Sequence, residues 1–580
     1  MNTNVQLGKQ YFKIVQNIIR KKEKQEAGRK KEQQRKQTTC EDLVSLPSNI
    51  DRHFSNASKM ESIDIDSAHG LREEIKALAN EIQTLKDIKE NEHLIKTNIA
   101  GMVEKPLANH ESQRKFEIRC PRGTRDYGPQ DMTLRRQVLD VVTECFKRHG
   151  GVTIDTPVFE LRDILMGKYG EEGGKLVYDL SDQGGELLSL RYDLTVPFAR
   201  YLAMNKTIMY IKRYHIGKVY RRDNPSRGRF REFYQCDFDI AGSYDLMIPE
   251  AELLRIISEI LNALDVGTFE IKVNHKLLLD GMFAVCDVPK KHYKAVYSSI
   301  DKLDKLPWED IKNELCNEKY IHCDVVSKLE TFVRLREHNN SLTNLDLLNW
   351  FEKDETTSQN NDIQKAVSEM KQLLEYCELF GILSTITIEP SLARGLDYYT
   401  GAIFEVTLKD CSEKIQIENG DSDKETRSIN IGSVAGGGRY DNLVSMFLPK
   451  HKVPCVGISL GIERLFTIMK EKLKMEDVRS KDTQVLVASA QKKLVKERMK
   501  ICRLLWDNNI KAEMALKANP KMLDQMQYCE EHKIPLAIIV GERELEEGIL
   551  KLRDVPSRIE QDIPRDNLVE ELNRRLKHLQ

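Results

Sequence analysis

Hydrophobic and polar residues alternate along two neighbouring stretches of the chain, TIMYIKRYHIGKVYRR and RFREFYQCDFDIAG, with the short segment NPSRG between them. Alternation with a period of two residues is typical of a β-strand, and two such stretches around a turn predict an antiparallel hairpin. One face of the second strand is apolar, as expected for a surface that packs on a core. We expect the other face to meet a ligand, because it carries Arg229, Arg231, Phe233, Gln235, Asp237 and Asp239.

An amphipathic pattern with the helical period predicts a long helix over residues 134–148, upstream of the hairpin. The β-branched stretch VTIDTPVF follows this helix and contains Pro157. Because proline cannot donate a ladder hydrogen bond, we expect this stretch at the edge of a sheet or at an interface. Together these signals predict an α/β chain whose α+β core has an antiparallel sheet with flanking helices, and they argue against a doubly wound parallel sheet.

Helical and strongly charged segments dominate residues 290–383, which indicates an insertion into the core. Strand signals resume at ITIEPSLARGLDYYTGAIFEV, and a polar, acidic stretch at residues 410–427 is expected to form a loop. The segments INIGSVAGGGRYDNLV and VPCVGISLGIERLF follow. Strand and helix signals then alternate through residues 484–580, which predicts an α/β module of about 100 residues that folds alone.

The first 115 residues differ from the rest in composition. Residues 9–36 hold eleven Lys or Arg against three acids, a pattern that fits a solvated basic helix, an RNA-binding appendage or an organelle presequence. Leu71, Ile75, Leu78, Ile82 and Leu85 recur at spacings of four and three, as in a coiled-coil or helical-hairpin seam. The expected division of the chain is a basic extension (1–70), a helical segment (71–115), two parts of a core (116–289 and 384–475) around a helical insertion (290–383), and the C-terminal module (484–580).

The composition is that of a soluble globular protein of 580 residues, of which 31% are charged and 40% hydrophobic. No apolar stretch approaches the ~18 residues of a membrane span, so we expect no membrane role. The twelve cysteines are scattered without a CxxC pair, which argues against a disulfide framework or a structural zinc site and indicates a reducing compartment. Because the formal net charge is only -1, contacts with nucleic acid must come from local patches.

Arginines in turn and aromatic contexts indicate a ligand with several phosphate groups, because guanidinium binds phosphate in a fixed geometry and keeps its charge. HIGK lies within a predicted strand and AGGGRYD lacks the lysine of a P-loop, so neither motif predicts a nucleotide site by itself. The glycines of AGGGRYD indicate a close approach of the backbone to a ligand or a crossing strand. The arginines concerned are Arg221, Arg229, Arg231, Arg394, Arg439 and Arg464.

Five segments together make the sequence resemble a histidyl-tRNA synthetase, a class II aminoacyl-tRNA synthetase. The predicted helix with the Pro157 strand is similar to motif 1 of that class, the hairpin to motif 2, and GISLGIERL to motif 3. SLARGLDYYTG and GSVAGGGRYDNLV are similar to two segments peculiar to the histidine enzyme. The resemblance extends from about residue 116 to the C-terminus.

The resemblance implies that histidine and ATP form histidyl adenylate, and that the histidyl group then passes to the terminal ribose of tRNA(His). Arg221 would bind the α-phosphate, Phe233 would stack on adenine, and Arg464 would cover the other side of the ring. Arg394 would approach the α-phosphate from the opposite side, so Arg221 and Arg394 are the expected catalytic residues. Magnesium would neutralise the pyrophosphate, and no protein ligand is assigned to it.

The same resemblance implies a histidine pocket. Asp193 and Thr195 are two residues apart, on one face of an expected strand, and would hold the α-ammonium group with Gln235. Asp239 would accept a hydrogen bond from the imidazole, while Asp237, on the same face as Gln235, has no assigned role. The expected histidine-binding residues are Asp193, Thr195, Arg221, Gln235, Asp239, Arg394, Tyr398 and Tyr399.

The resemblance further implies a homodimer with a C-terminal anticodon-binding domain, located in the cytoplasm, with a mitochondrial form as a second option. Two other functions stay open at this point. One is a catalytically silent relative that regulates histidine biosynthesis or senses uncharged tRNA, against which the presence of Arg221, Arg394 and Arg464 argues. The other is a general RNA-binding protein built around the basic N-terminus, which would not explain Gln235 and Asp239.

Overall fold

The structure is a computed structural model that describes residues 118–580 with several gaps. The gaps are residues 166–173, 182–183, 226–227, 304–305, 340, 395–397, 410–411, 418–424, 431, 473–478 and 578–580, and the strands at 412–417 and 425–430 are described without their side chains. The expected basic extension (1–70) and helical segment (71–115) therefore lie outside the described residues.

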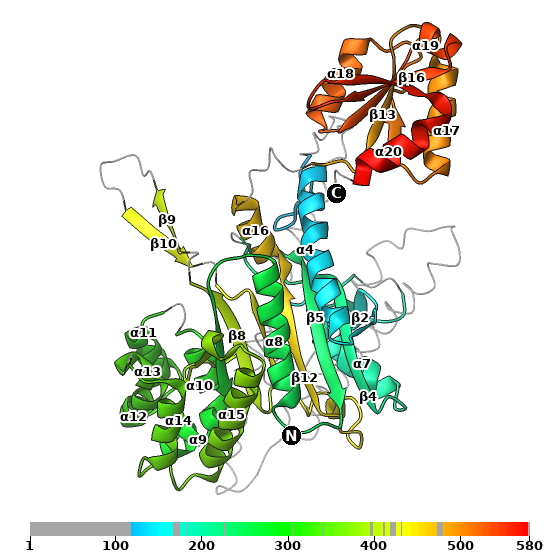
Figure 1. Ribbon diagram of the computed structural model, residues 1–580. Coiled ribbons are helices and arrows are strands. Elements are labelled where there is room, and N and C mark those ends of the chain that lie inside the picture. The colour runs from blue at the N-terminus through cyan, green and yellow to red at the C-terminus, as the bar shows by residue number, and fades with distance from the viewer. Residues whose placement is uncertain are drawn as a thin grey trace, which may run out of the picture. The chain divides into compact units, whose positions relative to one another are not determined.

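An eight-stranded sheet forms the centre of the body that precedes residue 473 (Figure 1). Its inner strand pairs are antiparallel, and only the two edge pairs, β1 with β4 and β6 with β7, are parallel among the described strands of this sheet. The predicted antiparallel core is confirmed. In spatial order the strands are β1 (Val152–Thr153), β4 (Tyr210–Tyr220), β5 (Glu232–Gly242), β12 (Cys455–Gly461), β11 (Ala435–Arg439), β8 (Ala402–Leu408), β6 (Phe269–His275) and β7 (Ile386–Ile388).

The predicted hairpin is present as β4 and β5, which pair over eleven residues each. Its connection is longer than the expected turn NPSRG, because it includes residues 221–231. Beyond the strands the Arg221 N–H still donates across the hairpin to the Arg231 carbonyl at 2.9 Å. The next donors pair with other segments: the Arg222 N–H donates to the Leu176 carbonyl at 2.8 Å and the Arg231 N–H to the Gly123 carbonyl at 2.7 Å. The two strands therefore separate at the end of the hairpin near Arg221, where the sequence predicts phosphate binding.

Two long helices cover one face of the sheet, α4 (Pro129–Arg148) and α8 (Ile248–Ala263) (Figure 1). The helix α4 begins five residues before the predicted start, with Pro129 at its first turn, where the missing proline N–H costs nothing. Phe146 of α4 packs on Phe238 of β5, with ring centroids 5.2 Å apart. Pro157 lies between β1 and β2 (Phe159–Leu161), and β1 is an edge strand as predicted.

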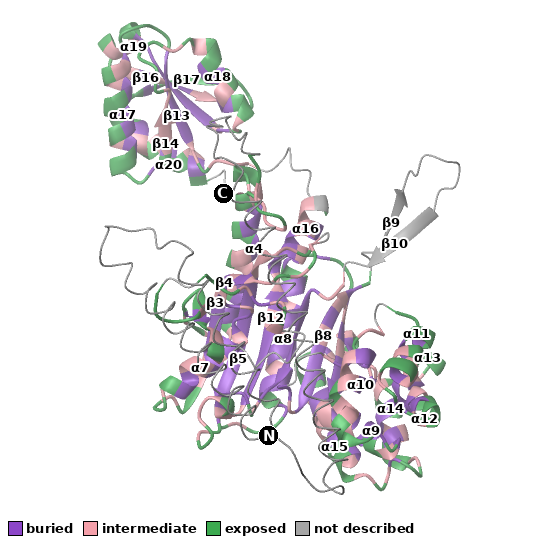
Figure 2. Ribbon diagram, turned by 180° about the vertical axis from the view of Figure 1, so that it is seen from behind, coloured by how far each residue is buried: buried purple, intermediate pink, exposed green. Residues whose placement is uncertain are grey.

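Residues 290–383 contain helices and no strand among their described residues, which agrees with the predicted helical character. Figure 2 shows that the inner strands of the central sheet are mostly buried, whereas these helices keep exposed outer faces. The helices are α10 (Tyr293–Ile300), α11 (Trp308–Asn313), α12 (Cys323–Val333), α13 (Leu335–His338), α14 (Asn344–Lys353) and α15 (Asn361–Leu379), and α14 and α15 pack together while α15 packs on α8 and on α9 (Lys276–Val285).

The prediction of an acidic loop at residues 410–427 is wrong in part. Residues 412–417 form β9 (Ser412–Ile417), which pairs in an antiparallel hairpin with β10 (Glu425–Asn430). The stretch KIQIE alternates polar and apolar residues, as a strand does. The many charged residues around it made a loop the expected structure.

The C-terminal module has a five-stranded sheet in the order β14-β13-β15-β16-β17 and hydrophobic cores of its own. Its strands are β13 (Val485–Ser489), β14 (Ala512–Met514), β15 (Leu536–Val540), β16 (Ile549–Asp554) and β17 (Glu560–Pro564), and its main helices are α17 (Val495–Asp507), α18 (Met522–Glu531) and α20 (Leu568–Lys577). The strand β17 was not predicted, because only Ile563 of its five residues is buried. Over the described part of the chain, no helix combines the length and the apolar character that a membrane span requires.

Candidate active site

A pocket lies over the middle of the central sheet, where β5, β12 and β11 are neighbours. The empty space there amounts to about 230 Å³, part of it open to solvent, and it is lined mostly by glycines and polar side chains. Four residues that the sequence predicted for histidine binding line it: Thr195, Asp239, Tyr398 and Tyr399.

Glycines make the floor of this pocket, as the motif AGGGRYD indicated. A Cβ atom at Gly437 would lie 2.0 Å from the carbonyl oxygen of Gly457 in the paired strand β12. A Cβ atom at Gly457 would lie 1.9 Å from Oδ1 of Asp239, and one at Gly436 would lie 2.3 Å from Nη1 of Arg394. The absence of side chains here lets the strands and the functional groups of the pocket come together.

The carboxylate of Asp239 is held by two partners that the sequence analysis missed. Arg213 of β4 places Nη2 2.7 Å from Oδ2, and the hydroxyl of Tyr440 donates to Oδ1. Burial raises the pKa of Asp239, and the charge of Arg213 opposes this rise. The hairpin register could have indicated Arg213, because it pairs directly across from Asp239, and Tyr440 lies within the quoted glycine motif.

Three acceptor atoms on the polar face of β5 have no hydrogen-bond partner within the described part of the chain. They are Oε1 of Gln235, Oδ1 of Asp237 and Oδ2 of Asp239, and all three side chains are buried. Of these atoms, Oδ2 of Asp239 has an ion-pair partner in Arg213. Nε2 of Gln235 donates to Oγ of Ser459 at 3.0 Å, which fixes the amide. Because buried acceptors without partners are rare, these atoms mark a place for the donors of a ligand.

Asp237, which had no assigned role, is buried beside two other carboxylates. Burial raises its pKa to about 7, with the charges of Asp239 and Asp193 adding to the rise and that of Arg213 opposing it. Nη2 of Arg213 is 4.0 Å from Oδ2 of Asp237. The end of the site around Asp239 therefore holds more carboxylates than basic groups that could pair with them.

The expectation that Asp193 and Thr195 share a strand face is wrong. The strand β3 (Leu188–Leu190) ends before them, and Thr195 is the first residue of the helix α7 (Thr195–Met204). Oδ1 of Asp193 accepts a hydrogen bond from the Val196 N–H at 3.1 Å, because short acidic side chains satisfy the free donors at a helix start. Both residues still reach the pocket region, since Thr195 lines it and the charge of Asp193 acts on Tyr398.

Four arginines from distant segments gather at the other end of the site. Burial and the positive charges of Arg229, Arg394 and Arg221 together lower the pKa of Arg464 to about 10. Arg394 forms an ion pair with Glu405 at 3.2 Å, while the guanidinium of Arg221 lies 5.1 Å from the ring centroid of Phe233. Cations that repel one another in a partly buried place form a binding site for an anion of high charge.

Arg439 does not belong to this group, contrary to the sequence analysis. Its side chain is buried, and its Nε donates to Oε1 of Glu250 in α8 at 2.7 Å. Asp441 lies 3.4 Å from its Nη1. The charge of Arg439 is therefore used to join β11 to α8 inside the core.

A buried ion pair holds the helix that carries Arg464, α16 (Ile462–Lys472). Arg135 of α4 forms two hydrogen bonds with Glu463, of 2.6 and 2.7 Å. The hydroxyl of Tyr127 and the N–H of Tyr234 also donate to this carboxylate, at 2.8 and 3.2 Å. The first turn of α16 is thereby fixed to α4 and β5, and with it the backbone from which Arg464 extends.

Two family models match the chain. One, described as histidyl-tRNA synthetase, matches residues 123–420, and the other, described as an anticodon binding domain, matches residues 484–575. A solved structure of histidyl-tRNA synthetase from a Nostoc species is similar, with a TM-score of 0.64 and 26% identity, and covers 80% of this chain and 100% of that chain.

Several relatives are similar over most of the sequence. The histidine–tRNA ligase of Caenorhabditis elegans is 57% identical over 461 residues, which are 79% of this chain and 88% of that relative. Relatives from Takifugu rubripes, named cytoplasmic, and Homo sapiens, named mitochondrial, are 51% and 50% identical over 475 residues, which are 81% of this chain and 90% of each relative.

Proposed function

The chain belongs to the histidyl-tRNA synthetase family, and from that premise we propose how its residues carry out the reaction. It is a histidine–tRNA ligase, which activates histidine with ATP and transfers the histidyl group to the 3′ end of tRNA(His). The observation that supports the residue assignment best is the pairing of a cation-rich end, at Arg221, Arg394 and Arg464, with an acid-rich pocket in one site.

The nucleotide binds at the arginine end. Arg221 contacts the α-phosphate, Phe233 stacks on the adenine ring, and Arg464 covers the opposite side of the ring and reaches the outer phosphates. The lowered pKa of Arg464 supports this assignment, because a triphosphate relieves the repulsion between these guanidinium groups when it binds.

Histidine binds at the acidic end. Its α-ammonium group donates to Asp193, Thr195 and the unpartnered Oε1 of Gln235. Its imidazole donates to Asp239, which Arg213 and Tyr440 hold in place. Tyr398 and Tyr399, both buried in the pocket wall, enclose the ring, so a side chain without the imidazole N–H would leave a buried carboxylate unpaired.

Arg394 lies where the two ends meet, since it neighbours both Gly436 of the pocket floor and Arg464. In the first step the carboxylate oxygen of histidine attacks the α-phosphorus, and the bond to the bridging oxygen of pyrophosphate breaks. Arg221 and Arg394 stabilise the negative charge that grows on the α-phosphate oxygens in the transition state. In the second step a ribose hydroxyl of the tRNA attacks the histidyl carbonyl, and AMP leaves.

The enzyme uses ATP, and enzymes of this class generally require magnesium. Mg²⁺ prefers phosphate oxygens and water as ligands, so it would be held by the phosphates of ATP and would supply positive charge to the leaving pyrophosphate. The guanidinium groups of the site would hold the outer phosphates around it.

The substrates tRNA and histidine follow from the ligase identity, and the family match of residues 484–575 assigns anticodon binding to the C-terminal module. We propose that the protein is a homodimer, because Val152 and Phe159, on the edge strand β1 and on β2, expose 53% and 51% of their surfaces. Relatives are named both cytoplasmic and mitochondrial. We propose a cytoplasmic protein, with a mitochondrial form as the second option.

The residue assignment is tested by histidine-dependent exchange of pyrophosphate into ATP in the absence of tRNA. We expect Arg394→Ala to lower this exchange about 10²- to 10³-fold, the usual effect of removing one donor to a transition-state oxyanion, while histidine still binds. Arg558→Ala, in an exposed ion pair of the C-terminal module, is the matched control and should leave exchange unchanged. Exchange at the wild-type rate in Arg394→Ala would remove Arg394 from the catalytic residues.

A further inference from the structure

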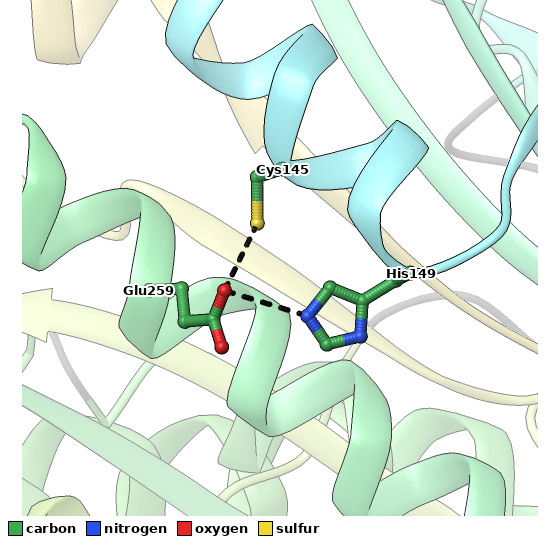
Figure 3. A group of neighbouring side chains, drawn as sticks. All are labelled: Cys145, His149 and Glu259. Carbon is green, nitrogen blue, oxygen red and sulfur yellow. Dashed lines mark hydrogen bonds and ion pairs between the residues drawn. The ribbon is translucent and has the colours of Figure 1, made fainter.

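A group of three side chains that the reaction does not use lies where α4 packs on α8 (Figure 3). Cys145 and His149 are four residues apart, so they lie on one face of the end of α4, and Glu259 faces them from α8. Thiolate, imidazole and carboxylate are the three protein groups that bind zinc. None of the three lines the pocket described above.

The distances within this group are close to those between ligands of one ion, while the thiol of Cys145 also donates a weak S–H···O hydrogen bond to Glu259. Sγ of Cys145 is 3.7 Å from Oε2 of Glu259, and Nε2 of His149 is 3.5 Å from the same oxygen. Zinc bonds of usual length at tetrahedral angles place such pairs about 3.5 Å (S and O) and about 3.3 Å (N and O) apart. A good N–H···O hydrogen bond measures about 2.9 Å.

A second carboxylate orients the imidazole. Oε1 of Glu252 lies 3.3 Å from Nδ1 of His149, and Nζ of Lys212 holds Glu252 at 2.7 Å. A proton on Nδ1 satisfies Glu252 and leaves the lone pair of Nε2 directed at Glu259 and Cys145. Histidines that bind metal ions have this arrangement, with a carboxylate on the ring nitrogen that does not bind the ion.

Two arginines also contact Glu259, and one of them must move away from the carboxylate when an ion binds. Arg255 donates to Oε1 at 2.8 Å, which leaves Oε2 for the ion. Arg148 contacts Oε2 at 3.0 Å, but 67% of its side chain is exposed, so it can turn to solvent. Burial and the charge of Glu259 raise the pKa of the Cys145 thiol to about 12, and an ion that binds as the thiolate complex therefore releases this proton to water.

We propose that Cys145, His149 and Glu259 bind a zinc ion, with water as the fourth ligand, which joins α4 to α8. Sulfur and nitrogen ligands select this borderline-soft cation over Mg²⁺ and Ca²⁺, which prefer oxygen. No local sequence pattern indicates the site, because Glu259 is more than a hundred residues away from Cys145 along the chain.

The test uses the full chain, freed of metal by a chelator and then titrated with Zn²⁺ while its thermal unfolding is followed. We expect Zn²⁺ to raise the midpoint temperature, and Co²⁺ to produce the absorption band of a thiolate-to-cobalt charge transfer. Cys145→Ser should weaken Zn²⁺ binding about tenfold or more and abolish the band, as one of three protein ligands loses its charge. Cys377→Ser removes another buried helical cysteine, one with no charged neighbour acting on it, and should change neither result.

If Cys145→Ser does not fold, His149→Gln tests the proposal instead. We expect this variant to fold, since the side chain of His149 lies at the end of α4 and is partly exposed. It should also weaken Zn²⁺ binding about tenfold or more, and it should leave the midpoint temperature in chelator close to that of the wild type. The proposal is wrong if Zn²⁺ shifts the wild type and His149→Gln equally, or if Co²⁺ gives the wild type no charge-transfer band.

Discussion

The guanidinium of Arg464 shows how single charges define the two ends of the site. Its pKa is lowered to about 10 because it is buried close to Arg229, Arg394 and Arg221, with too little negative charge nearby to compensate. At the other end Asp237 has a pKa raised to about 7 because it is buried near two more carboxylates. Each end is thus suited to the part of a ligand with the opposite charge. Without a ligand, the like charges within each end repel one another.

The repulsion at Asp237 predicts a pH-dependent effect on stability. A carboxyl whose pKa is higher in the folded than in the unfolded protein stabilises the fold while it is protonated, and this contribution is lost as pH rises from about 4 to about 7. Asp237→Asn keeps the neutral state at every pH. We therefore expect the midpoint temperature of the variant, relative to the wild type, to increase as pH rises through this range.

Thermal unfolding of both proteins across that pH range measures the effect, without histidine or ATP. Asp324→Asn, at an exposed carboxylate, serves as the control because it replaces the same group in solvent. A difference between Asp237→Asn and the wild type that stays constant with pH would contradict the burial of a protonated Asp237.

At the scale of the element, the glycine strand β11 decides how closely the parts of the site approach. It pairs with β8 on one side and β12 on the other, and Gly437 leaves no room for a side chain against the backbone of β12. The helix α16 is fixed in a comparable way by Glu463, which accepts from Arg135, Tyr127 and Tyr234. Removing one member of this buried pair would leave an uncompensated charge and should cost about 3–5 kcal/mol.

Two neighbouring glycines of β11 should respond differently to the same substitution. In Gly436→Ala the new methyl group meets the end of the Arg394 side chain, which can move, so the fold survives and pyrophosphate exchange falls about tenfold or more. In Gly437→Ala the methyl group meets the backbone of Gly457, so the protein loses its cooperative unfolding transition.

Circular dichroism and exchange activity distinguish these two outcomes. Gly128→Ala is the matched control, since no atom lies within 4 Å of the added methyl group. If Gly436→Ala retained full activity, Arg394 would not need its place above the pocket floor.

At the scale of the whole molecule, the residues assigned to the reaction and those of the C-terminal module belong to separate cores. A chain that ends at residue 475 should therefore retain histidine-dependent pyrophosphate exchange. It should lose tRNA charging efficiency (kcat/KM) about tenfold or more, because the anticodon contacts are gone. Loss of exchange in the shortened chain, despite a native circular dichroism spectrum, would show that the two parts depend on each other.

The proposed homodimer is tested at the same scale. Val152→Asp and Phe159→Asp together place two charges on the exposed apolar surface of β1 and β2. We expect sedimentation velocity to change from a dimer in the wild type to a monomer in the variant, since an unpaired charge at an interface costs several kcal/mol. Leu516→Asp, at an exposed apolar residue of the C-terminal module, is the control and should remain a dimer.

The sequence by itself determined the hairpin of β4 and β5, the helix α4, the edge position of β1 and the α/β module, because periodicity and turn chemistry act between neighbours along the chain. It also indicated Arg221, Arg394 and Arg464, since the residues around each arginine form a motif. It could not separate these arginines from Arg439, because the partner of Arg439 is Glu250, far away in the chain.

Only the tertiary structure decided which side chains hold Asp239, that Asp193 accepts a hydrogen bond from the first turn of a helix, and that Glu463 fixes α16 to α4. Each of these contacts joins segments whose proximity follows from the order of strands in the sheet and the packing of helices upon it. That order depends on the burial of the whole core at once, so no local pattern of residues specifies it.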